Sequence, residues 1–94
     1  KLELRLLRYA IAVAEDLHFT RASQRLHLAT PSLSRQIQQL EYTLGYPLFE
    51  RRTRSVELTP AGRAFVIEAR RALMCVQRAV EAGAAANAGN TGVI

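Results

Sequence analysis

The stretch of sequence that decides the fold is TPSLSRQIQQLEYTLG, residues 30–45. It predicts one helix, because Thr30 is a good N-cap, Pro31 suits the first helical position and Gly45 is a natural stop. The apolar residues of this helix recur at intervals of four, three and four, so they share one side of a 3.6-residue helix. They are Leu33, Ile37, Leu40 and Leu44. That side is expected to be buried.

The opposite side of the same helix carries polar and cationic residues and no acidic one. It consists of Pro31, Ser32, Arg35, Gln38, Gln39 and Tyr42, with Ser34 and Gln36 on the flanks. Arg pairs with guanine, Gln with adenine, and hydroxyls with either, so this chemistry is suited to reading base edges. For an isolated amphipathic helix a solvated face is the simpler interpretation. The rest of the sequence is therefore needed to choose between base readout and a solvated face.

Length and composition indicate one soluble globular domain with a basic character. The chain has 94 residues, of which 49% are hydrophobic and 22% charged, which is enough for a core and ordinary for a folded domain. A formal charge of +5 and a pI of about 10.4 favour a polyanionic partner. The basic residues are one Lys and twelve Arg, a bias that suits phosphates and base edges but that a GC-rich genome also produces. Residues 21–56 hold six Arg and two Glu, so the positive charge is local.

No motif in the sequence indicates a cofactor, a metal ion or a membrane. Cys75 is the single cysteine, lies among apolar residues and is expected to be inert packing. His18 and His27 lack the spacing and the companions of a metal site. No secretory segment and no apolar run long enough to span a bilayer are present, so the cytoplasm is the expected location. Lys1 in place of Met suggests a trimmed start or a start farther upstream.

Two shorter helices are predicted before the central one. The first covers roughly residues 3–15, and its inner stripe is Leu4, Leu7, Ile11 and Ala14. The second is capped by Thr20, runs to about Leu26, and turns Ala22, Ser23 and Leu26 inward. Leu28 is expected to fill the corner of the tight connection at residues 27–29. Helix, short turn and a helix that exposes readout chemistry form a helix-turn-helix.

After Gly45 the sequence predicts a small hairpin with a basic tip. Residues 48–51 and 56–58 are short strand-like runs, with Pro47 at the start of the first. Arg51, Arg52 and Arg54 cluster at the turn more densely than a solvated loop requires. Such a wing can send an Arg into the minor groove, where the negative potential is strongest when the groove is narrow.

The last part of the chain predicts a long helix and a flexible tail. Thr59 and Pro60 repeat the cap-plus-Pro signal, and the helix is expected to end at about Ala82. Its apolar band is too long for one small domain to cover, so a homodimer is favoured over purely internal packing. The expected dimerisation residues are Phe65, Ala69, Ala72, Leu73, Val76 and Val80. Residues 83–94 are small and are predicted to form a linker, with Val93 and Ile94 as the first step of an uncompleted strand.

Taken together, these motifs closely resemble the N-terminal domain of LysR-type transcriptional regulators. The matching runs are LRxLRYxIAVAE (4–15), FTRA (19–22), PSLSRQIxxLE (31–41), LGxxLFER (44–51) and LTPAG (58–62). The resemblance covers residues 2–62 almost continuously, and the character of the linker helix extends it to about residue 88. It implies a mainly α winged helix-turn-helix, with three helices and a short β-hairpin wing, followed by a long linker and dimerisation helix.

The resemblance also implies a domain plan and a function. Residues 1–58 would form the DNA-binding domain, residues 59–88 the dimerisation helix, and residues 89–94 a hinge toward an effector-binding domain that is absent from this chain. Such a protein binds double-stranded DNA at an interrupted promoter palindrome as a homodimer, often within a tetramer. A small-molecule inducer would act only through the absent domain.

The roles of individual residues follow from the positions that match the family. Pro31, Ser32, Ser34 and Arg35 match positions that meet bases and nearby phosphates, Arg54 matches the minor-groove wing residue, and Thr20 and Arg21 match phosphate contacts. The expected DNA-binding set is completed by Thr30, Gln38, Arg51 and Arg52. The sequence departs from the family pattern at three places: Ala29-Thr30 replace the usual Ser-Gln, Ser23 replaces Ala, and Ala10 replaces Phe. The first departure puts the readout of an adenine at that position in doubt.

Two other classes of function stay open at this point. A winged helix can dock an acidic protein through the same basic surface. An enzyme would need a paired acid and base or an activated nucleophile in a pocket, and no such constellation is found. Glu15 and Asp16 at a helix end are better explained as solvated surface.

Overall fold

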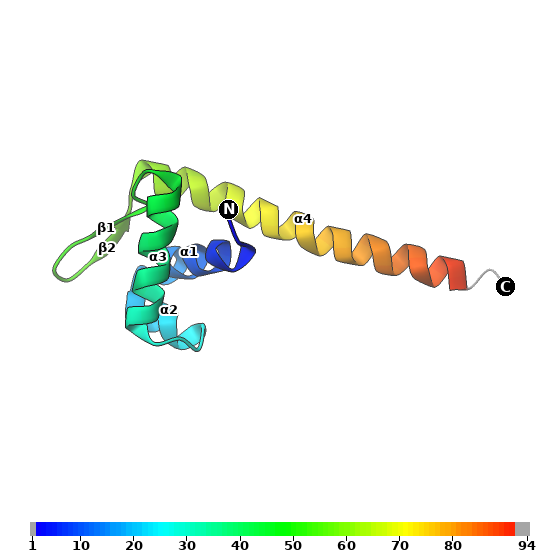
Figure 1. Cartoon of the computed structure of the whole chain (residues 1–94), viewed down its shortest axis with the longest axis horizontal. Helices are drawn as coiled ribbons and strands as arrows, with labels where there is room; N and C mark the ends of the chain where they lie inside the picture. Colours follow the sequence, from blue (N-terminus) through cyan, green and yellow to red (C-terminus); the bar gives the residue numbers. More distant parts are fainter. Residues whose placement is uncertain (1, 92–94) are drawn as a thin grey trace.

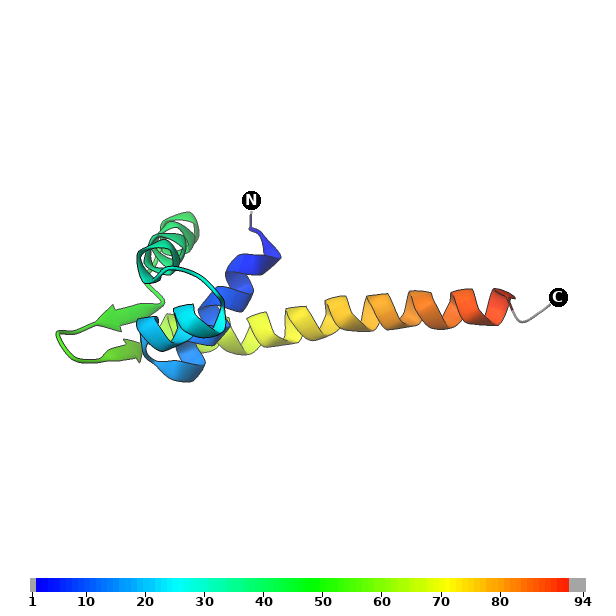
Figure 2. The same ribbon diagram turned by 90° about the horizontal axis from the view of Figure 1, so that it is seen from below.

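The computed structural model describes residues 2–91, although nothing is stated of the side chains of Asn90 and Thr91. In chain order the elements are α1 (Leu4–Asp16), α2 (Phe19–Arg25), α3 (Thr30–Leu44), β1 (Phe49–Arg51), β2 (Val56–Leu58) and α4 (Pro60–Thr91). Figures 1 and 2 show α1, α2 and α3 gathered at one end of α4, with the hairpin projecting beyond them. The molecule measures 63 × 25 × 21 Å. The predicted order of three helices, a hairpin and a long helix is confirmed.

The central helix α3 has the predicted buried side. Leu33, Ile37 and Leu40 are completely buried, while Leu44 is half-buried at the end of the helix. Gly45 ends α3 in the left-handed region, with a φ of 87°, and donates its N–H to the Glu41 carbonyl oxygen at 2.9 Å. Truncating one of the buried side chains to Ala would cost about 2–5 kcal/mol. The apolar side of α3 is therefore a main support of the domain.

In α1 the predicted stripe is wrong in part. Leu7 is buried, but Leu4 is 42% exposed, and the other buried residues are Leu6, Ala10, Ala12 and Val13. The reason is that α1 packs against α2, α3 and α4 together, so it is buried on several sides. When a helix is covered on several sides, the buried residues exceed the single stripe that its period identifies. Ala10, at which the family usually has Phe, is fully enclosed.

The hairpin joins α3 to α4 as predicted. Its strands are antiparallel, with Phe49 opposite Leu58 and Arg51 opposite Val56. The turn is closed by the Arg52 N–H, which donates to the Ser55 carbonyl oxygen at 2.8 Å. The β1 end nearest the core is held by Phe49, which is buried, whereas the tip at residues 52–55 is exposed.

The start of α4 is fastened to the segment before β1. The Thr59 hydroxyl accepts from the Gly62 N–H at 2.8 Å and donates to the Pro47 carbonyl oxygen at 2.8 Å. Thr59 thus caps α4, as predicted. A Cβ on Gly62 would overlap the Leu48 carbonyl group, so only glycine allows the helix to approach this closely. The cap and the glycine together fix the direction in which α4 leaves the domain.

The predicted end of α4 at Ala82 is wrong, because the helix continues to Thr91. It spans about 48 Å at 1.5 Å per residue. Residues 83–91 contain isolated Gly residues but no Pro, and their many Ala residues have the highest helix propensity, which outweighs about 1 kcal/mol lost per Gly. The part of the predicted hinge at residues 89–91 is accordingly helical. The expectations for Lys1 and for a strand at Val93 and Ile94 concern residues outside those described.

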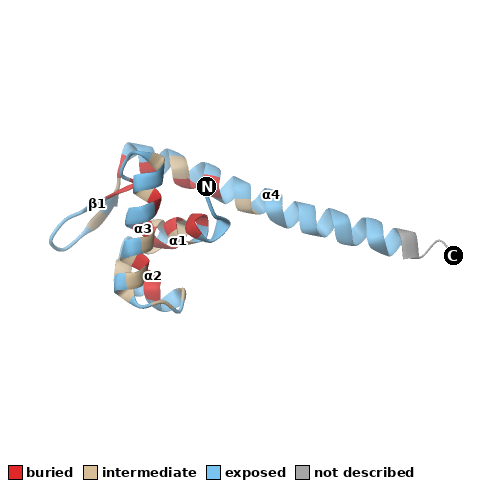
Figure 3. Cartoon of the chain, in the orientation of Figure 1, coloured by how far each residue is buried: buried red, intermediate tan, exposed pale blue. Residues whose placement is uncertain are grey.

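Most of α4 has no cover from the rest of the chain. Val66 and Ala69 are buried at the base of the helix, and from residue 74 to residue 89 every residue is exposed (Figure 3). Cys75 is one of them, so the expectation that it is packed inside is wrong. The apolar neighbours of Cys75 in sequence lie on a helix that has already left the domain. Burial therefore cannot be inferred from those neighbours.

The helices between residues 2 and 91 include none that is long and apolar enough to cross a membrane. Over the same residues, no group of three or more His, Cys, Asp or Glu side chains is placed to hold a metal ion.

Candidate nucleic-acid interface

The outer face of α3 is open to solvent. Pro31, Arg35, Gln38, Gln39 and Tyr42 are exposed, and Ser32, Ser34 and Gln36 are half-buried along the flanks. The hydrogen bond recorded for the Arg35 guanidinium in the described part of the chain is a long contact of 3.5 Å from Nη2 to the Ser32 hydroxyl. At that length the interaction is weak. The Arg35 side chain is therefore free to reach an acceptor outside the protein.

The first turn of α3 is arranged differently from the prediction. Thr30 does not cap the helix; it is the first helical residue, and Ala29 occupies the cap position without a side-chain hydrogen bond. The Thr30 hydroxyl instead lies 2.9 Å from the Ser23 hydroxyl in α2, and Ser23 donates to the Thr20 carbonyl oxygen at 2.8 Å. Because a hydroxyl has one proton, Thr30 must be the donor to Ser23. This pair of buried Ser23 and half-buried Thr30 joins the two helices of the helix-turn-helix.

The start of α2 also differs from the prediction. His18, not Thr20, is the N-cap residue, and its Nδ1 atom accepts from the Arg21 N–H at 3.1 Å. The helix begins at Phe19, two residues earlier than a cap at Thr20 would place it. Sequence reasoning missed His18 because histidine is not among the favoured cap residues. Thr20 and Arg21 remain exposed on the first turn of α2.

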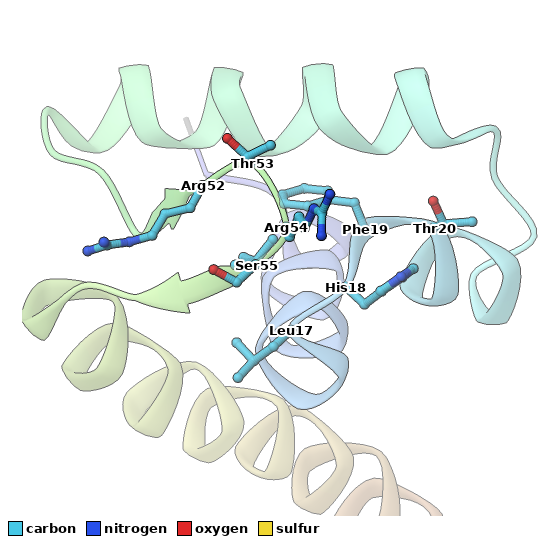
Figure 4. Close-up of a pocket in the computed structure, with 9 residues that line it drawn as sticks. Leu17, His18, Phe19, Thr20, Arg52, Thr53, Arg54 and Ser55 are labelled. Atoms are coloured by element: carbon cyan, nitrogen blue, oxygen red, sulfur yellow. The ribbon is translucent and has the colours of Figure 1, made fainter.

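A shallow pocket of about 250 Å³ separates the start of α2 from the wing (Figure 4). Its walls are residues 17–20 on one side and residues 52–56 on the other. Arg52 and Arg54 are exposed at the wing, and the Arg52 guanidinium donates to the Glu50 carboxylate at 3.0 Å. The pocket thus adjoins cationic side chains of the wing and the exposed start of α2.

Arg51 is held more firmly than the other wing arginines. Its Nη1 atom donates to the Ser34 hydroxyl at 2.6 Å, and its guanidinium carbon lies 4.0 Å from the centre of the Phe19 ring. Phe19 in turn meets Phe49 edge to face, with ring centres 6.2 Å apart. Desolvation lowers the pKa of the Arg51 guanidinium, and the charge of Glu41 opposes that shift. Arg51 therefore lies against α2 and α3, whereas Arg54 lies at the exposed tip.

Glu41 is a functional residue of the scaffold that the sequence reasoning did not identify. Its Oε2 atom accepts from the N–H groups of Leu48 and Phe49 at 2.7 and 3.1 Å. It thereby ties the end of α3 to the start of β1. The available signal was a single half-buried acid that follows the buried Leu40 on α3.

The acids at the end of α1 are bound to arginines. Arg25 on α2 pairs with Asp16 at 2.9 Å and with Glu15 at 3.2 Å, and Arg70 on α4 reaches Glu15 at 2.9 Å. The hydrogen bond that Arg25 donates to the Asp16 carboxylate raises the pKa of Arg25. Glu15 and Asp16 thus link three helices and are more than the solvated surface that was predicted.

The predicted dimerisation residues divide into two groups. Ala69 is buried and Phe65 is half-buried against the core of the same chain, so neither needs a second copy for cover. Leu73 is half-buried, and Ala72, Val76 and Val80 are exposed. Other large apolar side chains exposed on α4 are Ile67 and Met74. An apolar surface is therefore open along the outer part of the helix.

Comparisons with known proteins agree on one family. The family model described as "Bacterial regulatory helix-turn-helix protein, lysR family" matches residues 4–63. The HTH-type transcriptional regulator TfdT of Cupriavidus pinatubonensis is 48% identical over 91 residues, which are 97% of this chain and 40% of TfdT. This chain spans between 31% and 56% of the length of the first curated relatives that it matches.

Solved structures give the same result. A crystal structure of the CbnR_DBD–DNA complex superposes with a TM-score of 0.88 at 45% identity and covers 92% of this chain and 99% of that one. The BenM_DBD/benA site 1 DNA complex superposes with a TM-score of 0.89 at 44% identity and covers 94% and 99%. Both are DNA complexes of proteins whose chains have nearly the extent of this one.

Proposed function

The chain belongs to the LysR family of bacterial regulatory helix-turn-helix proteins, and on that premise we propose that it binds double-stranded DNA with sequence specificity as the DNA-binding part of a transcriptional regulator. The observation that carries the proposal is the exposed, acid-free outer face of α3 beside a basic wing. The relatives solved with DNA support it. Family membership also marks the chain as part of a transcriptional regulator, not an enzyme.

In the proposed complex α3 lies in the major groove. Arg35 reads guanine, and Pro31, Ser32, Ser34 and Gln38 lie close to the base edges and the adjoining phosphates. Thr20, Arg21 and Thr30 stand at the starts of α2 and α3, where phosphates would bind. Phosphate contacts set affinity and register, and base contacts set specificity.

The wing supplies a second contact. Residues 51–55 would follow the backbone into the adjacent minor groove, with Arg54 inserted where the groove is narrow. Arg52 would approach a phosphate, since its ion pair with Glu50 is exposed and worth little in solution. This arrangement favours A/T-rich sequence beside the major-groove site.

A homodimer through α4 accounts for the exposed apolar surface of that helix. A second copy would cover Met74, Val76 and Val80, which the chain leaves 37–61% exposed. A two-fold dimer places its recognition helices about 34 Å apart, in successive major grooves on one face of the duplex. The target would then be an interrupted promoter palindrome, and in the full-length protein two dimers would form a tetramer.

The proposed domain plan follows from these roles. Residues 1–58 are the DNA-binding domain and residues 59–88 the dimerisation helix, which leads toward an effector-binding domain in the whole protein. An inducer would act through that domain. A regulator of this kind works in the cytoplasm, where its promoter is.

The test is selection of bound duplexes from a random pool, followed by titration of a selected and a random duplex at two salt concentrations. We expect half-sites separated by about one helical turn and a preference for the selected duplex that persists in high salt. Binding should weaken with salt by a slope of about −0.9 per phosphate contacted. Equal affinity for both duplexes would contradict specific binding. Tight binding to an acidic protein and none to DNA would favour the alternative of a protein-docking winged helix.

A further inference from the structure

Arg51 occupies a position where three elements meet. It extends from β1, stacks on Phe19 of α2 and donates to Ser34 of α3. Stacking on an aromatic face and a directed hydrogen bond are the two interactions for which a guanidinium is better suited than an ammonium group. The side chain thus has the contacts of a structural brace within the chain.

The hydrogen bond to Ser34 determines what the Ser34 hydroxyl can offer to a partner. A serine hydroxyl has one proton and two lone pairs, and arginine has no acceptor. Arg51 must therefore be the donor and the Ser34 oxygen the acceptor in the 2.6 Å contact. The proton of Ser34 is not used in this contact. Toward a ligand in the groove, Ser34 then has its proton to donate and one remaining lone pair.

Several contacts hold Arg51 in this place. The bond to Ser34 is short and charge-assisted, which makes it about twice as strong as a neutral one. The Phe19 ring that supports the guanidinium is itself packed on Phe49. Glu41 contributes a nearby negative charge while its Oε2 atom holds the Leu48 and Phe49 N–H groups. The bond to Ser34 uses one of the five guanidinium N–H groups, and the stacking on Phe19 holds the group in one orientation.

We propose, resting on the DNA-binding function proposed above, that Arg51 is a positioning residue and not a DNA contact. It braces the wing against α3 and directs the proton of Ser34 toward an acceptor on the DNA. The acceptor is a purine N7, a guanine O6, a thymine O4 or a phosphate oxygen. This revises the expectation from the sequence, in which Arg51 was grouped with Arg52 and Arg54 as a direct contact.

The first test compares salt dependence among arginine variants on a selected duplex. Arg51→Ala should weaken binding about 10- to 100-fold, the range for a lost hydrogen bond to a charged group, with the salt slope unchanged. Arg54→Ala, the matched control at the exposed tip, should reduce the slope by about 0.9. Arg51→Lys should lose most of the same affinity, because a phosphate contact tolerates lysine and a stacked fork does not. A slope reduced in Arg51→Ala and restored in Arg51→Lys would overturn the proposal.

The second test removes acceptors from the DNA. Each purine of the half-site is replaced in turn by its 7-deaza analogue, and each phosphate by a methylphosphonate. One of these DNA changes should weaken binding of the unaltered chain but should not weaken binding of Ser34→Ala any further. Whether that change is in a base or in a phosphate identifies the acceptor. If a thymine O4 or a guanine O6 is the acceptor, the sensitive position is the thymine replaced by its 4-thio analogue or the guanine replaced by its 6-thio analogue. The loss should also disappear in Arg51→Ala, and the double variant should bind no more weakly than Arg51→Ala alone.

The results distinguish a failure of the proposed DNA-binding function from a failure of the role proposed for Arg51. If the unaltered chain does not distinguish a selected from a random duplex, the proposed function fails before any variant is compared. If it does, and the losses from Arg51→Ala and Ser34→Ala simply add, the role of Arg51 as a brace for Ser34 is wrong. Urea unfolding followed by circular dichroism checks that each variant is folded. If Arg51→Ala is unfolded, the comparison is made with Arg51→Lys.

Discussion

Gly62 is the residue at which a single methyl group should matter most. Gly62→Ala would place a Cβ against the Leu48 carbonyl group, which is backbone and cannot rotate away. We expect a loss of about 1–3 kcal/mol in the free energy of unfolding, the usual range for overpacking. Gly83→Ala is the matched control, because it lies in the same helix with open space around it. It should leave the urea midpoint unchanged or raise it and increase the helical signal; equal destabilisation by both would contradict the close approach.

Arg35 and Arg54 should have separable effects on DNA binding. Arg35→Ala should cost about 1–3 kcal/mol of binding free energy and relax the preference for the selected base, since Arg35 is the exposed cation at the centre of the α3 face. Arg54→Ala should mainly weaken A/T-rich sites. Competition binding against duplexes with single substitutions measures both effects. An equal loss on every duplex after Arg35→Ala would argue against base readout.

At the residue scale, sequence predicted the buried side of α3 well and hydrogen-bond partners poorly. Leu33, Ile37 and Leu40 followed from period alone, because a buried face needs only apolar side chains at the correct spacing. Thr30 was expected to cap its own helix, and its hydroxyl instead bonds to Ser23. The position of Arg51 on Phe19 depends on residues 32 positions apart. A local pattern cannot reveal such a pairing.

At the scale of elements, the group formed by Glu15, Arg25 and Arg70 connects α1, α2 and α4. Glu15→Gln should lower the free energy of unfolding by about 1 kcal/mol or less in low salt, because its partners are exposed, and the difference should shrink in high salt. Glu68→Gln is the control, since Glu68 pairs with Arg71 within the same helix. Urea titrations at two ionic strengths give the comparison. A loss that does not depend on salt would show that Glu15 acts by packing and not by charge.

The elements themselves were predictable where the chain carries strong end signals. Pro31 and Gly45 bounded α3, and Thr59 with Pro60 marked the start of α4. The far end of α4 was not predicted, because the small residues 83–94 have the composition of a flexible linker. A glycine ends a helix when the chain turns into the left-handed region there, as at Gly45, and Gly83 does not do so.

At the scale of the whole molecule, the exposed apolar side of α4 should be the site of self-association. Val80→Glu, at a side chain that is 61% exposed, should shift the chain from dimer to monomer without loss of folding, since a charge would be desolvated in the dimer. Gln77→Glu adds the same charge to a polar position of the same helix and serves as the control. Sedimentation equilibrium gives the dissociation constants. An unchanged constant for Val80→Glu would place the dimer contact elsewhere.

The overall shape was predicted in outline, because one domain of this size cannot cover a helix of such length. The division of the helix was not predictable: Phe65 and Ala69 have the same spacing as Val76 and Val80, yet the first two pack against their own domain. A repeating apolar pattern indicates that one side of a helix is buried, but it does not show which partner buries that side. The two groups differ only in whether they lie before or after the point at which α4 extends beyond α1.

Within the chain, α4 is packed against the domain only near its first residues, so the rest of the helix acts as a lever arm. A tilt of a few degrees at the seat formed by Thr59, Gly62 and Leu48 becomes a wide sweep at the opposite tip. In a dimer joined near the ends of the two α4 helices, the same tilt would instead change the distance between the two DNA-binding domains. The stiffness of that small seat would then govern how far the protein adapts to operators of different pitch and curvature.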